Sequence, residues 1–357
     1  MKEKIIICPR CKSKEIIKYG RRKIKSQYVQ IYQCQQCGNF FSDRKMKYKT
    51  YRENVILNGI SIYNLGYSLR ETKTQLAKRF KTKVPLSTIQ SWVKKYKDIC
   101  RYSGLREEGR VLYSPENLIF SRYFEHKQVY RFQYHKAKLD MCIKSGDQRK
   151  LSLLKEYLEW VAQKRENCPG TNSRRLFPHH IFTQESKNPK QRASQTEIER
   201  FVVTKVPKNN LTNSLAEYGL KLARSNYERH DKVENFMLIN DSVTVAAEVP
   251  VYLTNDDIKY FKKKGFQFNF NSNTPITGHI DLIQIRNGLI YILDYKPRAR
   301  KEKPFEQLIS YALALGSRTK LAIKDFKCAW FDEKDYFEFF PLHAVYRKRL
   351  REESVNS

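Results

Sequence analysis

Two aspartates and a lysine interrupt an otherwise apolar stretch near the C-terminal end of the chain. Residues 277–297 read TGHIDLIQIRNGLIYILDYKP, in which two runs rich in Ile and Leu flank Asn287-Gly288. An Asn-Gly pair between apolar segments favours a β-hairpin with a two-residue turn. Because side chains alternate along a strand, that register places Asp281 opposite Asp294, with Lys296 on the same face.

Two carboxylates that face each other across such a sheet need a counter-charge. Their Cβ atoms would be roughly 5 Å apart. The face that they share continues as Ile283, Ile285, Ile290 and Ile292. Like charges in this position are destabilising, and one lysine cannot neutralise both. A divalent cation such as Mg²⁺ or Mn²⁺ can.

A bound Mg²⁺ or Mn²⁺ would lower the pKa of a water ligand and stabilise the charge of a phosphorane-like transition state. Lys296 could orient or deprotonate that water, or stabilise the same charge. The pattern therefore indicates phosphodiester hydrolysis. The alternative is a pair of solvated strand ends, since isolated Asp…Asp-x-Lys patterns are common.

Further motifs around this hairpin resemble one family of nucleases. Gly278-His-Ile-Asp281 and Asp294-Tyr-Lys296 are followed by FEQLISYAL, which holds Gln307 and Tyr311. The segment VAAEVPVYL, before the hairpin, holds Glu248. In this combination the C-terminal part is similar to the PD-(D/E)xK nucleases, particularly to their RecB-like branch.

The resemblance implies a Mg²⁺- or Mn²⁺-dependent deoxyribonuclease with a restriction-endonuclease-like α/β core around a mixed central sheet. The catalytic residues that it implies are Asp281, Asp294, Lys296, Glu248, Gln307 and Tyr311. The catalytic metal would be held by Asp281, Asp294 and His230. His230 comes from the helical segment SNYERHDKVENF, where Glu228 and Glu234 compete with it for that role.

Gln307 and Tyr311 are four residues apart, so on a helix they share a face and are expected to reach one DNA strand together. An iron–sulfur cluster, which some RecB-like nucleases carry, is not expected, because only Cys168 precedes the core and only Cys328 follows it. The sequence also has no Gly-x-x-x-x-Gly-Lys-Ser/Thr loop for a built-in ATP motor.

Two CxxC pairs near the N-terminus predict a metal site. Cys8 and Cys11 are separated from Cys34 and Cys37 by 22 residues. Each CxxC turn aims two thiolates at one point, and two such turns complete a tetrahedral site for structural Zn²⁺. Residues 28–32 alternate as a strand should, so the unit is expected to be a zinc ribbon. Four further cysteines are expected to be small buried hydrophobes: Cys100, Cys142, Cys168 and Cys328.

Two segments after the ribbon predict a helix-turn-helix. Ser68 with Glu71, and Ser87 with Gln90, have the spacing of capping boxes, and apolar residues recur at helical spacing after each. The residues of the second helix that point away from its apolar stripe are expected to contact DNA: Thr88, Gln90, Ser91, Lys94 and Lys95. An ordinary helical hairpin with a solvated basic face is the alternative.

Residues 8 to about 97 resemble the zinc ribbon plus helix-turn-helix at the front of many prokaryotic insertion-sequence transposases, the InsA-like ribbons. In that family the module binds the terminal DNA of the element, so the resemblance implies DNA as the partner. The sequence that follows does not continue as a transposase of the acidic-triad type.

The charge of the chain agrees with a polyanionic partner. The 69 Lys and Arg against 37 Asp and Glu give a formal net charge of +32, and the first 110 residues alone hold 27 basic and 8 acidic side chains. Nucleic acid is the expected partner, and a membrane surface is the rival. No apolar run could span a bilayer and the N-terminus is not a signal peptide, so we expect a cytoplasmic protein.

We therefore expect a multidomain α+β protein. Its parts would be a zinc ribbon (1–48), a helix-turn-helix (49–100), a helical connector (101–210), a nuclease core (211–345) and a basic tail (346–357). In the connector, LSLLKEYLEWVAQ predicts an amphipathic helix, and His179 and His180 fit no standard metal site.

The expected function is that of a metal-dependent DNA endonuclease, directed to DNA by its N-terminal module, in a mobile element or a defence system. A homodimer or a complex with a partner subunit would suit double-strand cuts. Two alternatives stay open: a component of transposition or recombination, and a DNA-binding regulator with an inactive nuclease core.

Overall fold

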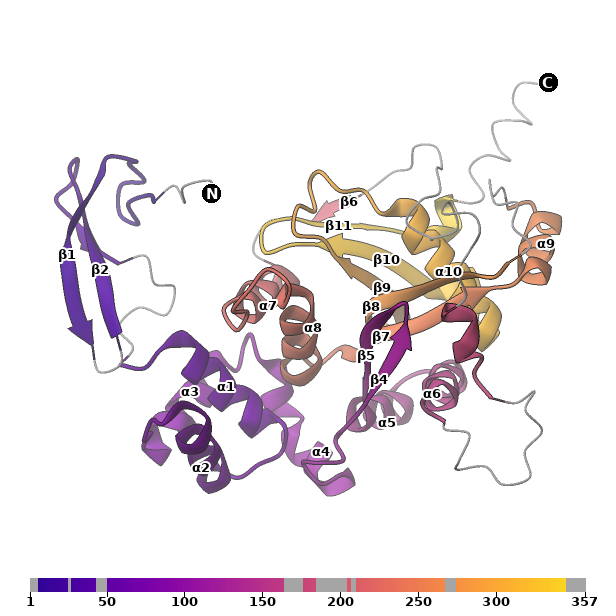
Figure 1. Cartoon of the computed structure of the whole chain (residues 1–357), viewed down its shortest axis with the longest axis horizontal. Coiled ribbons are helices and arrows are strands. Elements are labelled where there is room, and N and C mark those ends of the chain that lie inside the picture. The colour runs from indigo at the N-terminus through magenta and orange to yellow at the C-terminus, as the bar shows by residue number, and fades with distance from the viewer. Residues whose placement is uncertain are drawn as a thin grey trace.

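The chain forms a small three-stranded sheet, a group of helices and an eight-stranded sheet with helices on both faces (Figure 1). The computed structural model describes residues 6–24, 27–42, 50–163, 176–183, 204–206, 210–266 and 274–344. Cys168 and the tail at 346–357 lie outside these ranges. Within them, no helix combines the length and the apolar character that crossing a bilayer requires.

The small sheet contains β1 (Ile16–Ile24), β2 (Gln27–Cys34) and β3 (Phe40–Phe41) in the order β1-β2-β3. Both neighbouring pairs are antiparallel. The two CxxC turns lie beside the strands, at residues 8–11 and 34–37. This arrangement is compatible with the expected zinc ribbon.

Three helices follow: α1 (Glu53–Asn64), α2 (Leu69–Phe80) and α3 (Leu86–Tyr96). The predicted capping box of α2 is confirmed, because Ser68 N donates to Glu71 Oε2 at 2.7 Å and Glu71 N donates to Ser68 Oγ at 3.2 Å. The second predicted box is wrong. Helix α3 begins one residue before Ser87, with Pro85 at its N-cap and no side-chain cap hydrogen bond. Ser87 therefore lies inside the first turn of the helix, and the Pro85 ring has no acceptor for the first N–H groups.

The large sheet is mixed, as expected. Its strands are β4 (Ile119–His126), β5 (Gln128–His135), β6 (Thr204–Val206), β7 (Thr244–Leu253), β8 (Ile276–Arg286), β9 (Leu289–Tyr295), β10 (Phe326–Phe331) and β11 (Tyr336–Phe339). Their order is β4-β5-β7-β8-β9-β10-β11-β6. The neighbours β9 and β10 are parallel, and every other neighbouring pair is antiparallel.

The segment 101–210 is more than a helical connector, which corrects that prediction. The hairpin β4–β5 extends the large sheet, because Gln133 and Tyr134 pair with Ala247 and Ala246 of β7. Two helices follow it, α5 (Lys136–Ser145) and α6 (Gln148–Ala162), and α6 confirms the predicted amphipathic helix. Strand β5 pairs with a strand that is more than a hundred residues away in the sequence. No local sequence pattern predicts this pairing.

Helices cover both faces of the large sheet. On one face, α6 and α10 (Phe305–Thr319) pack Leu154 and Leu308 into the same core as Ile283. On the other face, α7 (Leu211–Leu220) and α8 (Arg229–Asn240) share a second core with Leu282 and Leu293. Helix α9 (Asn255–Lys263) follows β7. The sheet is thus the middle layer of three, with helices packed on each of its two faces.

A buried polar contact joins the N-terminal helices to the core. Asn64 of α1 donates to Asn240 Oδ1 at 2.9 Å, and Asn240 Nδ2 donates to Ser61 Oγ at 2.9 Å. Both asparagines are fully buried. The apolar side chains of α1 and α3, including Trp92, belong to the same core as α8. In Figure 1, α8 lies between α1 and the large sheet.

Replacement of Asn240 by alanine should therefore destabilise the protein by about 2 kcal/mol or more, because Ser61 and Asn64 keep buried polar groups that lose their partner. Denaturant unfolding measures this. Asn58→Ala is the matched control, since the hydrogen bond of Asn58 Nδ2 among the described residues stays within α1, to Asn54 O at 2.8 Å. Equal effects of the two substitutions would contradict the prediction.

Candidate active site and zinc site

The β8–β9 hairpin has the predicted register. Its pairs run from Arg286 with Leu289 to Leu282 with Leu293. The turn residues Asn287 and Gly288 have φ values of 49° and 73°, the left-handed conformation that a type I′ turn requires. Beyond the last pair, the next residues in this register are Asp281 and Asp294, which lie beside each other and interact directly.

Asp294 is fixed by two side chains. It is 1% exposed, its Oδ2 lies 2.8 Å from Lys296 Nζ, and its Oδ1 accepts from Gln307 Nε2 at 3.3 Å. Asp281 instead accepts from the backbone N–H of Tyr295 at 2.8 Å. The hairpin therefore brings together the two aspartates and the lysine on which the sequence interpretation depends.

Helix α8 adds two side chains rather than one. His230 Nδ1 lies 3.8 Å from Asp281 Oδ2 and 4.0 Å from Glu234 Oε1. One ligand atom each from His230, Glu234 and Asp281 lies within 4.8 Å of the others. Glu228, the remaining competitor, accepts from the backbone N–H of Arg224 instead. Asp294 is not a member of this group of three, because its oxygens face Lys296 and Gln307.

Glu248 contributes a carboxylate from β7. Its neighbours Ala247 and Val249 pair with Leu282 and Ile280 of β8, while Glu248 itself has a left-handed backbone with φ 51°. This conformation costs a non-glycine residue of order 1–3 kcal/mol. Glu248 is half-buried, and its charge interacts with those of Asp281 and Asp294.

Burial raises the pKa of all four carboxyl groups. The pKa of Asp294 rises to about 7 because it is buried and because Asp281 repels its charge. Burial and then mutual repulsion raise the pKa of Glu234 and Glu248 well above the ordinary value, and burial also raises that of Asp281. Lys296 stays charged, since Asp294 and Asp281 outweigh its burial and raise its pKa.

These groups fit a divalent cation. Glu234 Oε1 is buried and has no hydrogen-bond partner among the residues that the structure describes. A carboxylate set with one histidine offers hard oxygen ligands and one imidazole, which suit Mg²⁺ or Mn²⁺. Without a cation, the same groups must take up protons to remain buried, as their raised pKa values indicate.

Gln307 and Tyr311 of α10 form a hydrogen-bonded chain that ends on Asp294. Gln307 Nε2 donates to Tyr311 Oη at 2.9 Å as well as to Asp294. Tyr311 is only 6% exposed, and the expectation that both residues reach a DNA strand stays a prediction. A Cβ atom at Gly278 would lie 2.3 Å from the Tyr311 ring, so the glycine makes room for the tyrosine that holds Gln307.

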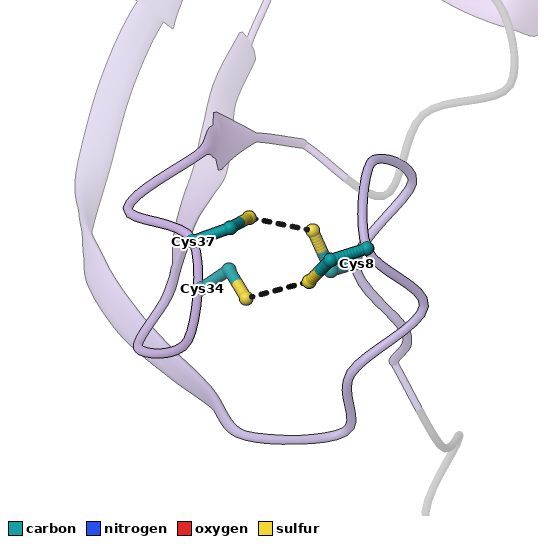
Figure 2. A group of neighbouring side chains, drawn as sticks. Cys8, Cys34 and Cys37 are labelled. Carbon is teal, nitrogen blue, oxygen red and sulfur yellow. Dashed lines mark hydrogen bonds between the residues drawn. The ribbon is translucent and has the colours of Figure 1, made fainter.

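The four N-terminal cysteines converge on one point. Cys8 Sγ lies 3.6 Å from Cys37 Sγ, and Cys11 Sγ lies 3.5 Å from Cys34 Sγ (Figure 2). All four sulfur atoms are within 4.8 Å of one another, as tetrahedral coordination of Zn²⁺ requires. Each CxxC turn ends in a left-handed residue, Lys12 with φ 64° and Gly38 with φ 68°.

The expected DNA-contacting face of α3 is accessible. Gln90, Ser91, Lys94 and Lys95 are exposed, and Thr88 is half-buried. The opposite face buries Ile89, Trp92 and Tyr96. The structure therefore leaves these polar side chains free of the core, as their spacing predicts.

Three histidines form a separate hydrogen-bonded chain. His126 Nδ1 lies 2.9 Å from His279 Nε2, and His126 Nε2 lies 3.1 Å from His179 Nδ1. Burial lowers the pKa of His126 and His179 to about 4. His126 uses both ring nitrogens in this chain, so the three rings do not aim at one ion. They are packed neutral residues, and His180 takes no part in the chain.

The comparisons with known proteins support the C-terminal part of this description. Residues 179–349, just under half of the chain, match a family model described as the PD-(D/E)XK nuclease superfamily. The match includes every residue of the candidate active site. It starts after β4, β5, α5 and α6, which belong to the same sheet and its helices. The searches of curated proteins and of solved structures found no match.

The raised pKa of Asp294 predicts how the metal-free protein responds to pH. A carboxyl group whose pKa is raised to about 7 in the folded state stabilises the fold at low pH, and this contribution is lost as pH rises from about 4 to 7. In EDTA, Asp294→Asn should therefore raise Tm at pH 8 by about 2 °C or more, and should flatten the fall of Tm between about pH 4 and 7. Asp256→Asn, at a carboxyl that is 95% exposed, is the control. Parallel curves of Tm against pH for the wild type and Asp294→Asn would show that the pKa of Asp294 is not raised.

The contact between Gly278 and Tyr311 predicts a coupled effect. Gly278→Ala should destabilise the protein by about 1–3 kcal/mol, because the new methyl group overlaps the Tyr311 ring. In the Tyr311→Ala background the same change should cost clearly less, since the overlapping ring is gone. Denaturant unfolding of the four proteins in this double-mutant cycle measures the coupling. Additive effects would show that the glycine is needed for another reason.

Proposed function

We propose that this chain is a metal-dependent nuclease that hydrolyses phosphodiester bonds in DNA. The observation that carries the proposal is the convergence of four carboxyl groups and one charged lysine at the end of a buried hairpin. The match of residues 179–349 to a nuclease superfamily supports the same reading. The motifs Gly278-x-x-Asp281, Asp294-x-Lys296 and Gln307-x-x-x-Tyr311 further suggest the RecB-like branch.

His230, Glu234 and Asp281 would hold the catalytic Mg²⁺ or Mn²⁺, with Asp294 and Glu248 beside them. When bound, such an ion supplies Lewis-acid stabilisation of the phosphoryl group and lowers the pKa of a coordinated water. The left-handed backbone of Glu248 keeps a further carboxylate near the cluster. This set of ligands differs from the sequence-based one, in which Asp294 stood where Glu234 now stands.

Lys296 would stabilise the transition state. Its Nζ is held 2.8 Å from Asp294, and the aspartates keep it protonated, so it is poorly suited to accept a proton from water. A fixed cation beside the reacting phosphate stabilises the extra negative charge that develops there. Gln307 keeps Asp294, and through it Lys296, in position.

The N-terminal modules would bring the enzyme to DNA. We propose that Cys8, Cys11, Cys34 and Cys37 hold a structural Zn²⁺, and that the exposed face of α3 contacts a DNA groove. The net charge of +32 supports a polyanionic partner. A closed site with four thiolates has no open position, so the zinc would stabilise the fold and take no part in cleavage.

Substitution of the site should separate cleavage from binding. We expect Asp281→Ala and Lys296→Ala to lower the rate of Mg²⁺- or Mn²⁺-dependent cleavage of plasmid DNA by about a thousandfold or more, while affinity for duplex DNA changes less than about threefold. A triple change of Gln90, Lys94 and Lys95 to alanine should weaken binding of duplex DNA, while the rate of cleavage at saturating DNA stays close to that of the wild type. Gel analysis of the plasmid and fluorescence anisotropy with a labelled duplex measure the two properties.

Asp256→Asn and Lys320→Ala, both outside the cluster, are the matched controls. Cleavage that survives both Asp281→Ala and Lys296→Ala would overturn the proposal. A wild type that binds duplex DNA but cleaves none with either metal would instead favour a DNA-binding regulator, and joining of DNA ends would favour a recombination component.

A further inference from the structure

The loop after the catalytic strand exposes cations that the candidate active site does not use. Residues 297–304 connect β9 to α10. Four basic side chains project from this loop into solvent: Arg298, Arg300, Lys301 and Lys303. The loop contains one carboxylate, Glu302, whose Oε1 lies 3.6 Å from Arg298 Nε. Arg300, Lys301 and Lys303 have no ion pair among the described residues.

This loop is held in place by buried contacts. Ala299, at its centre, is 1% exposed; its N–H donates to Asp332 Oδ2 at 3.0 Å and its carbonyl accepts from Trp330 Nε1 at 2.9 Å. The N–H groups of Lys301 and Glu302 both donate to Arg298 O, at 2.8 and 3.0 Å. The backbone is therefore folded into a tight turn that is hydrogen-bonded to Trp330 of β10 and to Asp332 after it.

The loop also lies beside the carboxylate cluster. It starts directly after Lys296, whose N–H donates to Phe331 O at 2.9 Å. The Nζ atom of Lys296 lies 2.8 Å from Asp294 Oδ2, so the loop leaves the sheet at the carboxylate cluster. The turn that carries Glu302 thus places its cationic neighbours at the rim of the site.

We propose that residues 298–303 are a clamp for the DNA backbone, which binds phosphates next to the one that is cleaved. This rests on the proposed nuclease function, because it takes Asp281, Asp294 and Lys296 as the site of reaction. Long cationic side chains on a fixed turn can follow several phosphates at once. These side chains would contact phosphates and not base edges, so the contact does not depend on the DNA sequence. The clamp would hold the scissile bond against the cluster while α3 binds elsewhere on the duplex.

Binding measurements test the clamp without relying on catalysis. The triple variant Arg300→Ala/Lys301→Ala/Lys303→Ala is compared with wild type by anisotropy of a fluorescein-labelled duplex in EDTA across a salt series. We expect about tenfold or more weaker binding at low salt, and a plot of log K against log salt that is shallower by about 3. The matched control, Lys259→Ala/Lys263→Ala/Lys264→Ala, removes three exposed lysines of α9 and its end, and should change the slope far less.

Cleavage measurements locate the contact. The clamp binds substrate and transition state alike, so the triple variant should raise KM and leave kcat at saturating DNA within about twofold. Once the wild-type cut is mapped, uncharged methylphosphonates are placed one at a time on either side of it. We expect weaker wild-type binding at one or two flanking positions, and no such loss in the triple variant.

Three results would overturn the clamp: equal effects of the loop and α9 variants, a lowered kcat with unchanged KM, or methylphosphonate losses that persist in the loop variant. Failure of the nuclease proposal is distinguishable. In that case the wild type cleaves no DNA with Mg²⁺ or Mn²⁺, whereas the salt series still reports whether the loop binds phosphates.

Discussion

Repulsion among buried carboxylates is the constraint around which the candidate active site is arranged. Repulsion between like charges is strong where water is scarce, so each group must be held by a rigid element of its own. Strand β7 holds Glu248, the β8–β9 hairpin holds Asp281 and Asp294, and α8 holds Glu234. Lys296 balances only part of this charge. The left-handed backbone at Glu248 has a free-energy cost that belongs to the same arrangement. A divalent cation would balance the negative charge that Lys296 leaves uncompensated.

The hairpin could be predicted because its determinants are local. Asn287 and Gly288 adopt positive φ more readily than most residues, and a two-residue turn leaves one register for the strands on either side. From that register, alternation alone places Asp281 beside Asp294. The same holds for the CxxC turns and for the cap of α2 at Ser68, where two or three neighbouring residues determine the geometry.

The remaining features depend on contacts between distant segments. Strands β4 and β5 enter the sheet through two residue pairs with β7, and no nearby residue specifies that pairing. Helix α8 is buried on most of its surface, so apolar spacing could not decide between His230 and Glu234, which lie one turn apart and both face the site. The spacing of Gln307 and Tyr311 places both on one helical face but does not show that Tyr311 is buried. The missing side chain at Gly278, on another element, is what lets the tyrosine be buried.

Helix α8 also connects the N-terminal helices to the candidate active site. Its first turns carry His230 and Glu234, and its last residue, Asn240, bonds to two residues of α1. Trp92 of α3 lies in the core that α1 shares with α8. One helix therefore spans from the carboxylates to α1. A duplex bound by α3 would meet the carboxylates at a spacing determined by α8, whereas a flexible linker would allow many. The buried asparagine pair favours this packing over others. If α1 shifted along α8, both side-chain amides would be buried without hydrogen-bond partners.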